Sequence, residues 1–130
     1  MAGSVPNAVV SKLGDGGTVC VFSSVSAHVL VDVNGSFPSV SDYASLVPAR
    51  LFDSRGPGLT VDGQLSGGGR VAAGSTTEVS VSGRGGVPVG AGAAVLNVTV
   101  VDAGAAGFVT VFPCGQAVPN ASNLNVAAGQ

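Results

Sequence analysis

The sequence predicts an all-β protein, an antiparallel β-sandwich of about nine or ten short strands. Three observations support this fold class: charged residues make up only 9% of the chain, valine and threonine recur throughout, and 21 of the 130 residues are glycine. β-branched residues favour strands and glycine favours turns, whereas leucine, lysine and glutamate, which favour helices, are few. The length indicates one domain spanning 1–130.

The first part of the chain is predicted to form a three-strand meander over 7–35. Its strands are expected at Asn7–Leu13, Thr18–Ser23 and Ala27–Val33. Between the first two, Gly14-Asp15-Gly16-Gly17 is expected to form a hairpin turn, because Asp-Gly and Gly-Gly supply positive backbone φ angles. Asn34-Gly35 is expected to end the third strand as a turn.

The last part of the chain is predicted to form a second meander over 93–127. Its strands are expected at Ala93–Val101, Phe108–Phe112 and Ser122–Val126. In the first of these, Leu96, Val98 and Val100 alternate with Val95, Asn97 and Thr99, which is typical of a half-buried strand. The two meanders repeat an Ala-Val start, a glycine-rich turn and a Val/Thr/Phe strand, which suggests a pseudo-twofold internal repeat within a sandwich.

Segment 36–92 joins the two meanders and is expected to complete both sheets. Residues 36–48 read as an irregular linker or crossover, followed by a short strand over Arg50–Arg55. The run Thr76–Ser82 alternates Thr77, Val79 and Val81 with polar residues, so it predicts a half-buried antiparallel strand.

Two cysteines, Cys20 and Cys114, each lie in or just after a predicted strand. Within one chain they can pair only with each other, and such a bond would close a long loop and indicate an oxidising, extracellular setting. The alternative is a pair of buried thiols that behave as small apolar groups. With one histidine and no Cys-x-x-Cys motif, neither a metal site nor a cofactor is expected.

The most distinctive polar group of this weakly charged chain is Arg50, Asp53 and Arg55, within Val-Pro-Ala-Arg-Leu-Phe-Asp-Ser-Arg. One interpretation is a hydrogen-bonded arginine–aspartate staple; the other is a contact site for a ligand or partner. In a regular strand Asp53 and Arg55 share a face, while Arg50 points to the opposite face. We therefore expect Asp53 and Arg55 to pair locally and Arg50 to find a partner elsewhere.

The inventory of side chains argues against catalysis, so no catalytic residues are assigned and no enzyme is expected. His28, the only histidine, lies within an apolar strand, and no Gly-x-Ser-x-Gly motif occurs. Asp32 and Asp53 could form a carboxylate pair for glycoside hydrolysis. The absence of tryptophan and the single tyrosine, Tyr43, count against a sugar cleft.

Charge and hydropathy also exclude some partners. A net charge of −2 with five basic residues spread along the chain predicts no nucleic-acid binding, because phosphates require a basic patch. No apolar run approaches 18 residues, so no membrane insertion is expected. Asp32-Val33-Asn34-Gly35 resembles the start of a calcium loop but lacks the later glutamate.

Several segments together resemble a known repeat, the tandem all-β modules of secreted and cell-wall-associated actinobacterial proteins. The segments that carry the resemblance are Val29–Gly35, Val47–Arg55, Val81–Pro88, Ala94–Val100, Gly107–Gly115 and Ala121–Asn125. The resemblance implies a non-enzymatic extracellular accessory or surface module for adhesion, display or spacing. A carbohydrate-binding or cell-wall-binding module is the alternative. Expected partners are cell-wall glycan or neighbouring copies of the module.

The order of these segments differs from the family pattern. There, the Pro-Ala-Arg segment comes early and Asp-Val-Asn-Gly ends the unit, whereas here Asp32–Gly35 precedes Pro48–Arg50. The chain therefore resembles a phase-shifted window of a tandem array, or a circular permutant. Either order predicts that Gly3 and Gln130 lie close together.

Overall fold

The computed structural model describes residues 3–38, 42–56 and 59–130, and these contain eight strands and no helix. The strands are β1 (Ser4–Lys12), β2 (Thr18–Ser23), β3 (His28–Phe37), β4 (Ala44–Asp53), β5 (Ser75–Ser80), β6 (Ala93–Val101), β7 (Gly107–Pro113) and β8 (Leu124–Val126). The predicted all-β class is confirmed, but the expected nine or ten strands are not found. Each of the eight segments predicted as strands overlaps one of these strands, and no further strand forms elsewhere in the described residues, so the expected total was too high.

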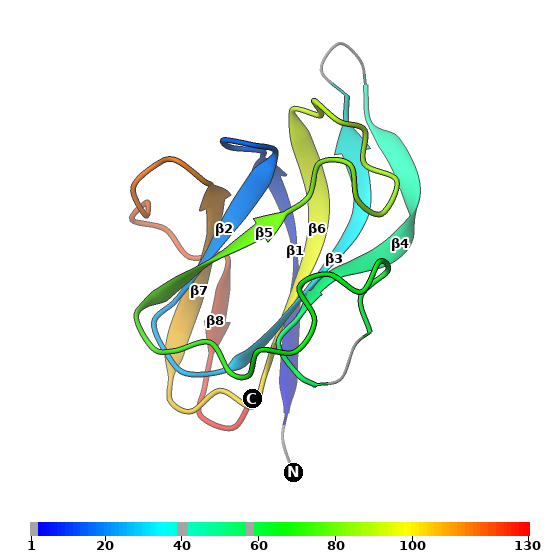
Figure 1. Ribbon diagram of the computed structural model, residues 1–130. Coiled ribbons are helices and arrows are strands. Elements are labelled where there is room, and N and C mark those ends of the chain that lie inside the picture. The colour runs from blue at the N-terminus through cyan, green and yellow to red at the C-terminus, as the bar shows by residue number, and fades with distance from the viewer. Residues whose placement is uncertain (1–2, 39–41, 57–58) are drawn as a thin grey trace.

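The strands form two antiparallel sheets of four that pack face to face as a sandwich (Figure 1). Sheet A has the order β1-β6-β3-β4, and sheet B has the order β5-β2-β7-β8. Both sheets contribute alternate residues to one core that is built mainly from valine, with fully buried Val31 and Val98 from sheet A and Val19 and Val109 from sheet B. In β6 the alternation holds as predicted: Leu96, Val98 and Val100 are buried and the residues between them are half-buried.

Neither predicted meander forms as three consecutive paired strands: β1, β2 and β3 alternate between the sheets, and β6 lies in sheet A while β7 and β8 pair in sheet B. β1 pairs with β6 and β2 pairs with β7, so the Gly14–Gly17 turn carries the chain from sheet A to sheet B. The two halves do correspond over their first two strands. They diverge at the third, since β3 returns to sheet A while β8 stays in sheet B.

The predicted linker over 36–48 also differs from the structure. β3 continues past Asn34-Gly35 to Phe37, with a register shift between Val33 and Gly35, and β4 already begins at Ala44. Residues 39–41 of that linker lie outside the described residues. Pro48 is tolerated because β4 is an edge strand, where a missing N–H breaks no ladder. Gly35 leaves room for the Tyr43 ring, which would have to move if residue 35 carried a side chain.

The two ends of the described chain meet, as the segment order predicted. The Gly3 amide donates to the Gly129 carbonyl at 2.8 Å, and the Ala103 amide donates to the Gln130 carbonyl at 2.6 Å. Figure 1 shows the C-terminus beside the start of β1, at one end of the sandwich. Among the described residues, none forms a helix of sufficient length and hydropathy to cross a membrane.

Candidate functional site

The predicted polar group is joined by a fourth residue, and we call Asp32, Arg50, Asp53 and Arg55 the polar centre. Arg55 binds Asp53 with two side-chain bonds, from Nε to Oδ1 at 3.0 Å and from Nη2 to Oδ2 at 2.9 Å. Arg50 Nε donates to Asp32 Oδ1 at 2.8 Å, and its Nη1 lies 3.4 Å from Asp53 Oδ2. The local Asp53–Arg55 pairing is therefore confirmed, and Arg50 finds its second aspartate on the neighbouring strand β3.

The prediction that Arg50 points away from Asp53 is wrong because of a β-bulge. Leu30 lies opposite Asp53 and Asp32 lies opposite Arg50, so the β3–β4 register shifts by one residue between Val31 and Asp32. An extra residue in one strand reverses the alternation beyond it. The bulge places both ends of the ion pair on the outer face of sheet A.

Asp53 is the buried hub of the polar centre, with its side chain only 2% exposed. Burial alone would raise the pKa of the Asp53 carboxyl, but hydrogen bonds from the Arg55 side chain and backbone and the charges of Arg55 and Arg50 lower it below its usual value. The Asp53 backbone also joins the loop beside it, since its amide donates to Leu65 O and its carbonyl accepts from Gly67 N.

This geometry does not suit the carboxylate chemistry considered from the sequence. Arg50 bridges Asp32 and Asp53, and two arginines stabilise the ionised form of Asp53. A glycoside hydrolase needs one of its two carboxyl groups protonated, with a raised pKa, near the working pH. The Asp53 pKa moves in the opposite direction, so Asp53 is unsuited to act as a general acid.

A second ion pair, which the sequence did not reveal, has a buried arginine. Arg84, in the turn after β5, donates from Nε and Nη2 to both carboxylate oxygens of Asp62 at 2.8 Å. It also donates to the carbonyls of Ser80 and Leu51, each at 2.8 Å. The Arg84 guanidinium lowers the pKa of the Asp62 carboxyl to about 2. One side chain thus ties β4, β5 and the 59–65 loop together.

The histidine that the sequence placed in an apolar strand is held by a buried serine. His28 Nδ1 lies 2.9 Å from Ser54 Oγ, and the same hydroxyl accepts a hydrogen bond from the Val29 amide at 2.8 Å. Ser54 is buried, and its own amide donates to the Val29 carbonyl. His28 and Ser54 therefore join the start of β3 to the end of β4.

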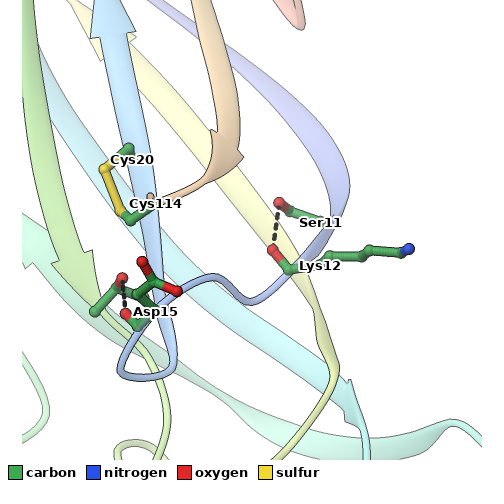
Figure 2. Close-up of a disulfide and its surroundings, with 6 residues drawn as sticks. Ser11, Lys12, Asp15, Cys20 and Cys114 are labelled. Atoms are coloured by element: carbon green, nitrogen blue, oxygen red, sulfur yellow. Dashed lines mark hydrogen bonds between the residues drawn. A yellow bond between two sulfur atoms is a disulfide. The ribbon is translucent and has the colours of Figure 1, made fainter. Parts of the chain in front are cut away.

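The predicted Cys20–Cys114 disulfide is present and joins β2 to the chain just after β7 (Figure 2). The two Cα atoms lie 5.1 Å apart; Cys20 is opposite Phe112, and Cys114 follows two residues later. The Glu78 carboxylate lies within 4.8 Å of both sulfur atoms. Metals bind cysteine thiolates, and the two sulfur atoms here are bonded to each other. The three residues therefore do not form a metal site.

The turn that carries the chain between the sheets packs against this disulfide, as Figure 2 shows for Asp15. The Asp15 amide donates to the Cys114 carbonyl at 3.1 Å, and Thr18 Oγ1 donates to the Asp15 carbonyl at 2.7 Å. A side chain at Gly14 would strike the Cys114 backbone. The glycine-rich turn thus serves to let two chain segments approach closely.

A hollow of about 390 Å³ lies on the outer face of sheet B, and we call it the Phe groove. Its floor contains the rings of Phe22 and Phe108, whose centroids are 5.8 Å apart. Segment 118–122 forms its wall, and Asn125 also lines it. No pattern in the sequence points to this site, because Phe22 and Phe108 lie in different halves of the chain and are brought together by the pairing of β2 with β7.

The chain was compared with known proteins in three ways. No protein-family model, no curated protein and no solved structure matches it.

Proposed function

We propose that the protein is a non-enzymatic extracellular accessory or surface module that serves in adhesion, display or spacing. The observation that carries this proposal is that each of the four arginines is engaged by an aspartate of the same chain. Arg50 and Arg55 bind within the polar centre, Arg70 binds Asp102 and Arg84 binds Asp62. Arginine side chains that are paired with aspartates of the same chain hold loops in place and are not free to recognise a ligand.

The polar centre fits the role of a staple better than that of a binding site. Asp53 accepts three hydrogen bonds from Arg55 alone and is almost completely buried. A ligand that recruited Arg55 would have to break a bidentate pair, which is the stronger kind of charge-assisted hydrogen bond. The alternative function, carbohydrate or cell-wall binding, therefore receives no support from Arg50, Asp53 and Arg55.

The extracellular location rests on the disulfide. The Cys20–Cys114 bond crosslinks residues that are 94 positions apart. Structural disulfides persist in oxidising compartments and are rare in the reducing cytosol. A module that meets proteases and variable conditions outside a cell benefits from such a crosslink.

The segment order supports a place in a tandem array. Gly3 and Gln130 lie side by side, so an array could supply this chain in either phase without altering the sandwich. We propose neighbouring copies of the same module as partners.

Surface labelling of cells that express the protein tests the proposal. Antibodies raised against the folded chain should stain intact cells or detect the protein in the medium, and protease added outside the cells should remove the signal. The expected result is accessibility with the disulfide formed. Confinement to the cytosol with two free thiols would overturn the extracellular role, and turnover of glycoside or ester substrates that Asp53→Asn abolishes would overturn the non-enzymatic one.

A further inference from the structure

We propose that the Phe groove binds a neutral saccharide. This inference rests on the proposed extracellular surface module, and it places carbohydrate binding at a site other than the polar centre. The Phe groove lies on the outer face of sheet B, whereas the polar centre lies on the outer face of sheet A. The two sites can therefore be altered separately.

The floor of the Phe groove follows from the register of three strands. Phe22 of β2 is opposite Thr110 of β7, and Phe108 lies two residues from Thr110 on the same face. Phe108 is in turn opposite Asn125 of β8. Two aromatic rings and an amide side chain thus follow one another across the sheet, and Phe108 retains 38% of its surface exposed.

The wall of the groove is held in place before any ligand arrives. Thr110 Oγ1, which is fully buried beneath the loop, donates to the Ala121 carbonyl. Asn123 anchors the end of the same loop. Its side-chain Oδ1 accepts from Val111 N at 2.8 Å, and its backbone N–H donates to Val109 O at 2.9 Å. A preorganised wall lowers the entropy cost of binding.

Free polar groups line the groove above the rings. In the described part of the chain, the side chains of Asn120, Ser122 and Asn125 make no hydrogen bond to other residues, and all three are exposed. Each asparagine offers two donors and an acceptor, and the serine offers one donor and two acceptor lone pairs. Apolar surface with a few convergent polar groups is the usual composition of a small-molecule site, and about 390 Å³ lies within the usual range of roughly 300–1,000 Å³.

The chemistry of the lining selects the class of ligand. Among the residues that the structure describes, no charged side chain lines the hollow, so an anionic or cationic ligand would find no opposite charge there. A fatty chain would leave the three polar side chains without partners. A neutral sugar ring uses both features, because its C–H face can cover the phenylalanine rings while its hydroxyl groups exchange hydrogen bonds with Asn120, Ser122 and Asn125.

Titration of the intact, oxidised protein with neutral oligosaccharides tests the proposal. The probes are cellotetraose, maltotetraose and chitotetraose, followed by amide chemical shifts in nuclear magnetic resonance spectra. We expect saturable shifts for at least one probe, centred on Phe22, Phe108 and the 118–125 segment. Phe108→Ala should weaken binding by about tenfold or more, as truncation of an aromatic anchor does.

Tyr43→Ala is the matched control, because Tyr43 is an exposed aromatic residue whose ring pairs with Phe37, outside the groove. It should change the affinity by less than about twofold. Asn125→Ala provides a second test in the groove if Phe108→Ala disturbs folding. No binding to any of the probes, shifts that map to the polar centre, or unchanged affinity in both groove variants would overturn the proposal. Preference for a neutral peptide or a nucleoside over every saccharide would also overturn it.

The outcome is independent of the surface-labelling test. Failure of saccharide binding in a protein that is exposed on cells would remove the groove proposal and leave the surface module. Saccharide binding by a protein confined to the cytosol would keep the groove proposal and remove the extracellular surface module.

Discussion

The buried Arg84 guanidinium grips both carboxylate oxygens of the more exposed Asp62, with two hydrogen bonds of 2.8 Å. Loss of the carboxylate would leave the buried Arg84 charge with backbone carbonyls as its partners and, within the described ranges, no opposite charge. We therefore expect Asp62→Ala to lower the free energy of unfolding by about 3 kcal/mol, measured by urea denaturation. Asp102→Ala, which removes the partner of the more exposed Arg70, should cost less than about 1 kcal/mol. Equal losses in the two variants would contradict this ranking.

The same carboxylate predicts how stability depends on pH. Its pKa is lowered from 3.8 to about 2 in the folded protein, first by the hydrogen bond from Arg84. A group whose folded pKa is depressed contributes stability that is fully present above its unfolded pKa and is lost as the pH falls towards its folded pKa. The urea concentration at the unfolding midpoint should therefore decrease as the pH is lowered from about 4 to about 2. In Asp62→Asn this fall should be shallower, and an unchanged slope would exclude Asp62 as a source.

The disulfide should contribute a large share of stability. Replacing both Cys20 and Cys114 with alanine removes a crosslink between residues 94 positions apart, which should cost about 4–5 kcal/mol in the chain-entropy account. Thermal and urea unfolding of the oxidised protein and of the double variant measure the difference. Alkylation of the native, unreduced protein followed by mass spectrometry is the direct check. Two modified thiols in that experiment would show that the bond does not form.

Alanine substitutions at two glycines compare a crowded position with an open one. A methyl group at Gly14 would strike the Cys114 backbone, so Gly14→Ala should destabilise the protein by about 2 kcal/mol. A methyl group at Gly56 would meet no atom within 4 Å, so Gly56→Ala should be neutral or slightly stabilising. Thermal melts of the two variants provide the comparison. A neutral Gly14→Ala would mean that the turn does not rest on the disulfide segment.

The neighbouring ends predict tolerance of a changed chain order. A permuted chain that begins at Asp42, joins Gln130 to Gly3 through a short Gly-Ser linker and ends at Pro38 should fold cooperatively and form the same disulfide. The reason is that the new join connects atoms already in contact, and the new ends lie beyond the strand ends at Phe37 and Ala44. Circular dichroism and thiol alkylation monitor both properties. Failure to fold would argue against a phase-shifted array.

Local patterns predicted the parts of the fold that depend on single strands. The alternation across β6 reports the burial of Leu96, Val98 and Val100 because side chains in a strand face opposite sides in turn. The length of β4 was not predictable in this way. Pro48 marks an interruption in a central strand but is acceptable on an edge, and edge position depends on pairings with distant residues.

The candidate sites show the same division. The Asp53–Arg55 pair was predicted because two residues of separation in a strand place side chains on one face. The Arg50–Asp53 contact required the bulge opposite Asp32, and the Phe groove required β2 to pair with β7. A bulge and a long-range pairing have no marker in the residues that they bring together.

The contact between Gly3 and Gly129 has a mechanical consequence. When a chain enters and leaves a domain at the same point, the domain adds volume but almost no end-to-end length. In a tandem array of such modules, the connecting segments would set the overall length. Each sandwich would project sideways from them. Within the proposed array, adjacent ends would therefore favour display over spacing.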